Sequence, residues 1–266
     1  MPREHLPPIL FGLALLLLIT GCRAAPVPDT ALSTSAIERH LDRLSTGQSP
    51  LDSLAAARRA EYASARLGAA GVQPVARGSF YVRHGPQAHG PAGASPDPSR
   101  SHIVGYISGR NPRYRSELVL VTGDLDRPAA AAILEAARLL VHEASMYIVP
   151  EASVGFALWS PPNTGSAGVA DFLGRPTWAL DGIRSVIHVA TDMGGLEDQR
   201  ALWAQAGIPF LVVLPDEAIA PEITRARTLH VATTYRLAEQ SLLLMRSVAA
   251  GPAVPVAGAV PTRSNP

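Results

Sequence analysis

Residues 117–141, ELVLVTGDLDRPAAAAILEAARLLV, form the stretch that decides the fold. No charge interrupts the aliphatic and β-branched run between Glu117 and Asp124, which predicts a central strand over 118–122 that is covered on both faces. A helix is predicted from Pro128 onward, because a proline fits the first helical turn and apolar residues then recur at helical spacing. The expected sheet-facing side of this helix comprises Ala130, Ile133, Leu134, Ala137 and Leu140.

Two carboxylates, Asp124 and Asp126, stand at the carboxyl end of the predicted strand. Open α/β sheets place their ligand sites at this end of their strands. Two interpretations remain open at this point. The two side chains either belong to a ligand site, or they only cap the following helix and close the turn.

The composition of the 266 residues fits one sizeable α/β domain, since 47% of them are hydrophobic and 17% are charged. The formal net charge is +1 and no basic patch with interleaved aromatic residues is present, so we expect no nucleic-acid partner. The single cysteine, Cys22, excludes an internal disulfide and a cysteine-based metal site.

Residues 1–21 have the pattern of a cleaved targeting segment, in which Arg3 precedes an apolar run that is short for a membrane span. The run ends in Ile-Thr-Gly before Cys22, which resembles the bacterial lipobox, where the cysteine is lipidated and becomes the new amino terminus. The alternative is an ordinary secretory signal with an incidental cysteine.

Several acyl chains on Cys22 would anchor the protein in the lipid bilayer, whereas one chain alone holds only weakly. Arg23 follows the cysteine, and no aspartate stands there to suggest retention at the inner membrane. We therefore expect a lipid-anchored protein of the bacterial cell envelope, at the outer membrane and facing the periplasm.

The chain divides into a lipoprotein signal peptide over 1–21, a tether over 22–33, one α/β domain over 34–249 and a tail over 250–266. The tail is rich in Pro, Ala and Gly, so we expect it to be disordered. Strands that alternate with helices predict a three-layer α/β/α domain around a mainly parallel mixed sheet. The expected helices are 34–44, 51–67, 128–142, a short one through 172, 197–206 and 234–248, and the expected strands are 75–83, 102–108, 118–122, 153–159, 183–191 and 210–214.

The helix expected over 51–67 has an imperfect apolar stripe. Arg58 falls on this stripe and fits it only if its stem lies along the apolar face while its head reaches water. The apolar members of the stripe are Leu51, Leu54, Ala55, Tyr62 and Ala65.

Several other residues with chemical potential have simpler interpretations. His84, His89 and His102 flank a Gly- and Pro-rich segment and are interpreted as scattered loop histidines, with a metal site as the alternative. His188 shares a strand face with Asp192 by period two and is expected to be packed. The tryptophans, which we expect in the core or lining a pocket, are Trp159, Trp178 and Trp203.

The order of these segments resembles the di-zinc aminopeptidase family, which includes bacterial leucyl aminopeptidases, glutaminyl cyclases and the transferrin-receptor ectodomain. HIVGYISGR at 102–110 is similar to the family's Asn-Val-Ile-Gly strand, and IRSVIHVATDMGG at 183–195 is similar to its strand ending in Asp-Met. AGIPFLVVL at 206–214 is similar to a late Gly-Ile-Pro strand. The resemblance covers nearly all of the domain and implies an aminopeptidase-like α/β fold.

The resemblance also implies positions for the family's zinc ligands. Asp124 takes the position of the first ligand histidine, and Asp126 matches the aspartate that orients that histidine. Asp192 matches a ligand at the end of the third strand, and His230 matches the last ligand histidine. We therefore expect Asp124, Asp192 and His230 to be the residual metal-binding positions.

Two departures from the family pattern bear on catalysis. The segment that carries the aspartate bridging the two zinc ions is missing, and Pro161-Pro162 takes the place of the Glu-Glu pair that supplies a ligand and the general base. A general base typically accelerates a reaction by about 10²- to 10⁴-fold, and a proline side chain offers none. We expect no catalytic residue here, and a domain that has lost hydrolysis and acts as a binding or structural envelope protein.

Alternatives to this interpretation remain. The main alternative is that the domain is an active zinc-dependent metallopeptidase of the aminopeptidase type with a rearranged metal site. We expect no cofactor, or at most one weakly bound divalent cation, since an oxygen-rich donor set suits Ca²⁺ or Mg²⁺ at least as well as zinc. Otherwise Arg175, Arg184 or another arginine neutralises the carboxylates. A peptide or protein ligand is a possible occupant of the cleft.

Overall fold

The computed structural model describes residues 30–44, 53–75, 78–83, 97–125, 128–146, 148–161, 164–215 and 226–250. Several predictions concern residues outside these ranges: the signal peptide over 1–21, the tether up to residue 29 and the tail over 251–266. The same holds for Cys22, His84, His89, Asp126 and Pro162. Among the helices of the described ranges, none combines the length and the apolar character that crossing a membrane requires.

Seven strands of the described residues form one mixed sheet with the order β1-β3-β5-β4-β6-β7, and β2 pairs with β3 outside this path. Parallel pairing joins β5, β4, β6 and β7, whereas β3 runs antiparallel to β5, β1 and β2. The strands are β1 Gln73–Pro74, β2 Tyr81–Arg83, β3 Ser101–Ile107, β4 Leu118–Asp124, β5 Ser153–Trp159, β6 Ile183–Val189 and β7 Phe210–Val213.

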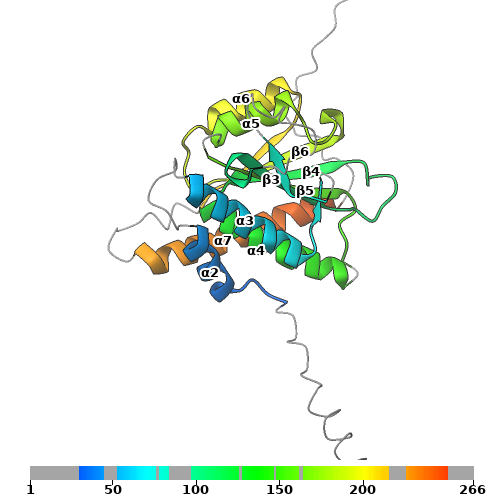
Figure 1. Cartoon of the computed structure of the whole chain (residues 1–266). Helices are drawn as coiled ribbons and strands as arrows, with labels where there is room; N and C mark the ends of the chain where they lie inside the picture. Colours follow the sequence, from blue (N-terminus) through cyan, green and yellow to red (C-terminus); the bar gives the residue numbers. More distant parts are fainter. Residues whose placement is uncertain are drawn as a thin grey trace, which may run out of the picture.

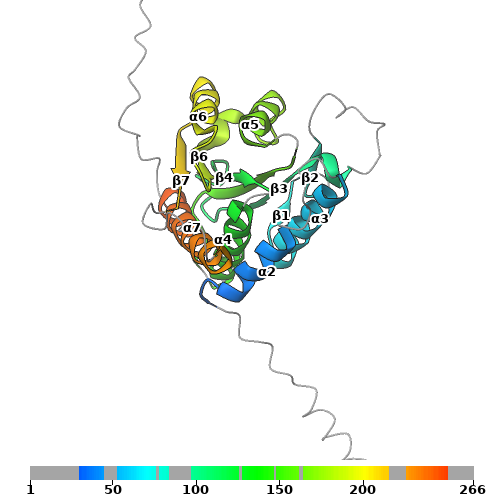
Figure 2. The ribbon, with the colours of Figure 1, turned by 90° about the vertical axis from the view of Figure 1, so that its left-hand side faces the viewer.

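Helices cover both faces of this sheet, as Figures 1 and 2 show: α5 and α6 lie on one face, and α2, α3, α4 and α7 lie on the other. The predicted α/β fold, with a mixed sheet between two helical layers, is therefore confirmed. The helices are α2 Thr34–Leu44, α3 Ser53–Ala70, α4 Pro128–Ser145, α5 Gly165–Gly174, α6 Leu196–Gln205 and α7 Ala226–Ala249, with short 3-10 helices at Pro98–Arg100 and Leu180–Gly182.

The central strand β4 is buried on both faces, as its uninterrupted apolar run predicts. Val119 and Val121 belong to the apolar core shared with α2, α3, α4 and α7. Leu118 and Leu120 belong to the second core, beneath α5 and α6, because successive side chains of a strand point to opposite faces. Of the three tryptophans, Trp159 and Trp203 lie fully buried in this second core, as expected, and Trp178 packs against it from its margin.

The helix α4 is more deeply buried than its sequence pattern predicts. All five predicted positions are buried, but so are residues on the remaining faces of the helix, because α2, α3 and α7 cover the side that faces away from the sheet. The five predicted positions are thus confirmed as buried, and α4 is in addition a core helix covered on its other side. The additional buried residues are Ala129, Ala131, Ala132, Glu135, Ala136 and Leu139.

The stripe predicted for α3 is also wrong in its orientation. Leu54 is 58% exposed, and Arg58 faces solvent instead of lying along the core. Small side chains occupy the buried face instead, together with one arginine, because they let α3 pack closely on β3 and α4. The buried residues of α3 are Ala55, Ala56, Arg59, Ala60, Ala63 and Leu67.

Two predicted boundaries differ from the structure. Of the strand predicted over 75–83, the described residues form β2 at its end, and β1 lies just ahead of its predicted start; both pair with β3. The last helix starts at Ala226, ahead of the predicted start at Thr234, so His230 lies inside α7 and not in a segment before it.

Candidate functional site

The carboxyl ends of β4, β5 and β6 meet at one edge of the sheet because these strands are parallel. Asp124 is the last residue of β4, and it pairs with Trp159 at the end of β5. Pro161 follows β5 closely, and Asp192 follows β6. Three of the positions that the family resemblance singles out therefore lie along the edge where α/β folds bind ligands.

The carboxylate of Asp124 is already engaged at this edge. Its Oδ1 accepts a hydrogen bond from the backbone N–H of Gly165, the first residue of α5, over 2.8 Å. The side chain of Thr164, which precedes α5, makes no capping hydrogen bond. A negative charge at a helix N-terminus satisfies an N–H without a partner in the helix and is favoured by the helix dipole.

The capping interpretation of Asp124 is thus correct in kind, but it named the wrong helix. Asp124 was expected to cap α4, which follows it in the chain, whereas the carboxylate caps α5, which follows β5. Half-buried Asp124 therefore fastens the α5 layer to the central strand.

Asp192 differs from Asp124 because its side chain is exposed and turned toward its own loop. Its Oδ1 accepts a hydrogen bond from the Gly194 N–H over 2.9 Å, an arrangement typical of a turn closed by an aspartate. Gly195 has a φ of 71° at the N-cap of α6, where a residue with a side chain would be strained. The turn that carries Asp192 thus leads directly into α6.

Pro161 takes the family's Glu-Glu position just after β5, and Ser160 before it is bound to β3. The sequence alone did not predict this contact. The N–H of Ser160 donates to Nδ1 of His102 over 3.2 Å, and the Ser160 hydroxyl donates to the carbonyl of Ser101 over 2.6 Å. His102 Nε2 lies 3.4 Å from an Asp171 carboxylate oxygen of α5. Pro161, which follows, is buried.

His102 lies in β3, as the strand predicted over 102–108 places it, and it is buried, so its grouping with scattered loop histidines is wrong. Burial lowers the pKa of its imidazole below the usual value, although Asp171 opposes this shift. A neutral ring accepts from Ser160 at Nδ1 and carries its proton at Nε2, toward Asp171. His102 therefore ties β3, β5 and α5 together beside the candidate site.

His188 is packed, as expected. Its Nδ1 lies 2.9 Å from the hydroxyl oxygen of Thr122 in β4, and its ring stacks on Phe210 at a centroid distance of 5.9 Å. Burial lowers the pKa of His188 to about 4, so the ring is neutral at pH 7. His188 thus cross-links β4 and β6 through an uncharged contact.

Arg184 does not neutralise the carboxylates at this edge. Its Nη1 lies 3.5 Å from the carboxylate of Glu117, which immediately precedes β4 at the opposite edge of the sheet. Arg175 follows the last turn of α5, at the end opposite the Asp124 contact. The prediction that one of these arginines fills the old metal position is wrong for Arg184.

The proposed metal set is only partly described. Asp124 and Asp192 lie at the same edge of the sheet, while the side chain of His230 and all of Asp126 lie outside the described part of the structure. Among the side chains that are described, no group of three or more His, Cys, Asp or Glu is arranged to hold a metal ion.

Comparison with known proteins places the fold. No model of a protein family matches the chain, and no curated protein matches it. A solved structure of LapA from Legionella pneumophila is similar with a TM-score of 0.56 at 11% identity, over 83% of this chain and 74% of that chain. A second structure, of the LapA aminopeptidase, gives 0.51 at 11% identity over 94% and 78% of the two chains.

LapB from the same organism is similar with a TM-score of 0.50 at 13% identity, over 83% of this chain and 73% of that chain. Identities this low establish a shared fold and nothing about activity. The fold that the sequence resemblance implies is thereby confirmed: the chain has an aminopeptidase-like α/β fold.

Proposed function

We propose that this chain is a membrane-anchored bacterial lipoprotein whose aminopeptidase-like domain has lost hydrolysis and serves as a binding or structural protein of the cell envelope. One observation carries the proposal. At the edge of the sheet where the family resemblance places metal and base, Pro161 is buried and the Asp124 carboxylate caps α5.

Each of these two residues weighs against hydrolysis for a separate reason. A proline has neither a ligand atom nor a base in its side chain, and a missing general base alone costs about 10²- to 10⁴-fold in rate. A metal ion that took Oδ1 of Asp124 would compete with the Gly165 N–H, and loss of this helix cap costs about 1 kcal/mol.

The described donors do not fit a two-zinc centre. Among the described side chains no group of three or more His, Cys, Asp or Glu is arranged to hold a metal ion, and Pro161 contributes no ligand. The remaining donors are oxygen-rich, which suits a single hard cation such as Ca²⁺ or Mg²⁺ at least as well as zinc. We therefore propose at most one weakly bound ion at this edge.

The second candidate function is an active zinc-dependent metallopeptidase of the aminopeptidase type. Asp124 and Asp192 favour it, since both stand at the carboxyl edge of the sheet. A peptide or protein ligand at the same edge is compatible with either function.

Hydrolysis is tested on the purified full chain in a neutral detergent with excess zinc and a panel of aminoacyl and dipeptide substrates. We expect no turnover above the buffer rate, with an active aminopeptidase as positive control. Zinc-dependent turnover that disappears in the variants Asp192→Ala and His230→Ala would overturn the proposal and establish the second candidate.

Anchoring is tested separately, because it rests on the sequence around Cys22. The variant Cys22→Ala, expressed in a bacterial host, should lose lipid labelling and leave the membrane fraction. Lipid labelling that persists in this variant contradicts a lipid anchor at Cys22.

A further inference from the structure

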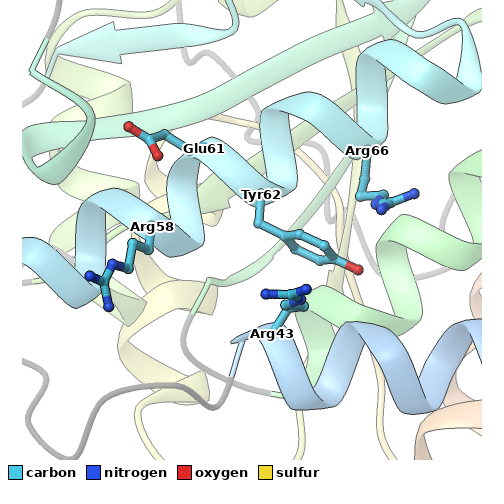
Figure 3. Close-up of a pocket in the computed structure, with 5 residues that line it drawn as sticks. All are labelled: Arg43, Arg58, Glu61, Tyr62 and Arg66. Carbon is cyan, nitrogen blue, oxygen red and sulfur yellow. The ribbon is translucent and has the colours of Figure 1, made fainter.

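A basic pocket lies between α2 and α3, on the other face of the sheet from the α5 helix that Asp124 caps. Its cavity measures about 520 Å³. Figure 3 shows Arg43 reaching from α2 toward Tyr62 on α3. The residues that line the cavity are Arg43, Arg58, Glu61, Tyr62 and Arg66.

Helical periodicity explains how α3 builds one wall of this pocket. Arg58, Tyr62 and Arg66 follow one another at intervals of four residues, so they form a stripe on the outer side of α3. The buried side of the same helix is the alanine-rich face that packs on β3 and α4. Arg43, in the last turn of α2, faces this stripe from the neighbouring helix.

Arginines outnumber carboxylates in the lining of the pocket. Three arginines and one glutamate line it, and Figure 3 shows the Glu61 carboxylate pointing away from Tyr62. Within the described part of the chain, neither Arg58 nor Arg66 forms an ion pair, and the guanidinium carbon of Arg66 lies 5.2 Å from the centre of the Tyr62 ring. Arginine keeps its proton in a protein, so these side chains give the pocket a positive potential that attracts anions.

A buried histidine, His40, lies behind Tyr62. Burial, opposed by Glu135 and assisted by Arg66 and Arg39, lowers the pKa of His40 to about 4. The neutral His40 ring lies with Nδ1 2.7 Å from the Tyr62 hydroxyl and with Nε2 3.9 Å from the Glu135 carboxylate. With its proton at Nε2, the ring accepts a hydrogen bond from Tyr62.

This contact fixes the aromatic wall of the pocket. Tyr62 is held at its hydroxyl by His40, and its ring supports the guanidinium of Arg66. A wall that is ordered before a ligand arrives reduces the entropy lost on binding.

We propose that this pocket binds a ligand that carries phosphate, with Arg43 and Arg66 beside Tyr62 as cationic partners at one end and Arg58, farther along α3, as the cationic partner at the other end (Figure 3). Guanidinium forks match phosphate oxygens in a bidentate manner, which favours phosphate over a monatomic anion. The cavity exceeds the size of a bare phosphate and falls in the range of small-molecule sites, so the phosphate belongs to a larger ligand. The site is independent of the function proposed for the carboxyl edge.

Calorimetric titration of the full chain in a neutral detergent at low ionic strength tests this site, with sodium pyrophosphate and glycerophosphoglycerol as probes. The latter is the deacylated headgroup of an anionic phospholipid. We expect saturable binding of at least one probe, and a loss of about tenfold or more in affinity in the double variant Arg58→Gln, Arg66→Gln, since each charge-assisted hydrogen bond contributes strongly.

The matched control is Arg200→Gln, which removes an equally exposed arginine from α6 in the other helical layer. It should bind both probes as the unmodified chain does. Tighter binding of pyrophosphate supports a soluble phosphate compound, and equal or tighter binding of glycerophosphoglycerol supports a lipid headgroup. Binding of neither probe, or the same loss in Arg200→Gln as in the double variant, overturns the proposal.

Discussion

Two carboxylates, Asp124 and Glu135, occupy contrasting places in this molecule. Asp124 is half-buried at the edge of the sheet, where its carboxylate accepts a hydrogen bond from the first backbone N–H of α5. Glu135 is fully buried in α4, where it accepts two hydrogen bonds from Arg138, over 2.8 and 2.9 Å, and one from the Ser33 N–H over 2.7 Å. Arg138 in turn donates to the carbonyl of Ala31, so this network secures the segment that leads into α2.

The comparison shows that a residue which the sequence marks as a candidate ligand need not be the one that contributes most to stability. Asp124 stands where α/β folds bind ligands, yet it serves as a helix cap. Glu135 sits in an alanine-rich helix with no obvious role in the sequence, yet it is the carboxylate whose neighbours would suffer most from its removal. A buried charge that loses its partner is far more costly than an exposed one.

Replacing Glu135 should therefore have the largest effect. In Glu135→Ala, Arg138 and the Ser33 N–H lose their common acceptor, and the free energy of unfolding should fall by about 3 kcal/mol, since Arg138 can still reach water. Urea unfolding followed by circular dichroism measures this change. The control Glu239→Ala, at an exposed position of α7, should stay within about 0.5 kcal/mol of the unmodified protein. Equal effects of the two replacements would contradict a special contribution of Glu135 to stability.

The free energy of unfolding should depend on pH through two buried histidines, His188 in β6 and His40 in α2. Burial lowers the pKa of His188 to about 4, and burial also dominates the same shift in His40. Between about pH 6.5 and pH 4 the unfolded chain binds protons at these rings that the folded chain does not. The free energy of unfolding should therefore be fully retained above pH 6.5 and fall as the pH drops toward 4, by at most about 3 kcal/mol for each ring.

The share of His188 is measured by comparing urea unfolding at pH 7 and pH 4.5 in the variant His188→Gln. The difference between the two pH values should be smaller than in the unmodified chain, because the replacement cannot be protonated. His142→Gln, at a half-buried position in the last turn of α4, is the control. An undiminished pH dependence in His188→Gln would show that this ring is not kept neutral by the fold.

The smallest effects are expected for the two aspartates at the carboxyl edge. They test whether Asp124 contributes to stability only as a helix cap. Asp124→Ala should lower the free energy of unfolding by about 1 kcal/mol, because the N-terminus of α5 loses a charged cap that is only half-buried. Asp192→Ala should change it by less than about 0.5 kcal/mol, because that side chain is exposed and bonds within its own turn.

Thermal unfolding with and without zinc separates capping from metal binding at the same edge. If the two aspartates act only on local structure, added zinc should not stabilise the unmodified chain more than either variant. A zinc-dependent rise in melting temperature that both replacements abolish would favour a shared metal site over a helix cap.

The sequence by itself determined the central strand, the helix after it and the layered α/β arrangement, because a strand buried on both faces must be apolar at every position, and a local pattern suffices to show this. It also placed Asp124 at a strand end. The sequence failed for α3, where alanines lie on several faces and give little contrast between inside and outside, so the predicted stripe was rotated toward Leu54 and Arg58 and away from Arg59.

Only the tertiary structure decided what the polar groups do, because their partners are distant in the chain. The Gly165 N–H that binds Asp124 lies 41 residues away, and the Ser33 N–H that binds Glu135 lies 102 residues away. No local periodicity encodes which helix begins beside a given strand end, or which face of a helix is covered by three others. Hydrogen bonds and charge pairing act over a few ångströms of space, so the partners of Asp124 and Glu135 became evident only from the packing of the layers.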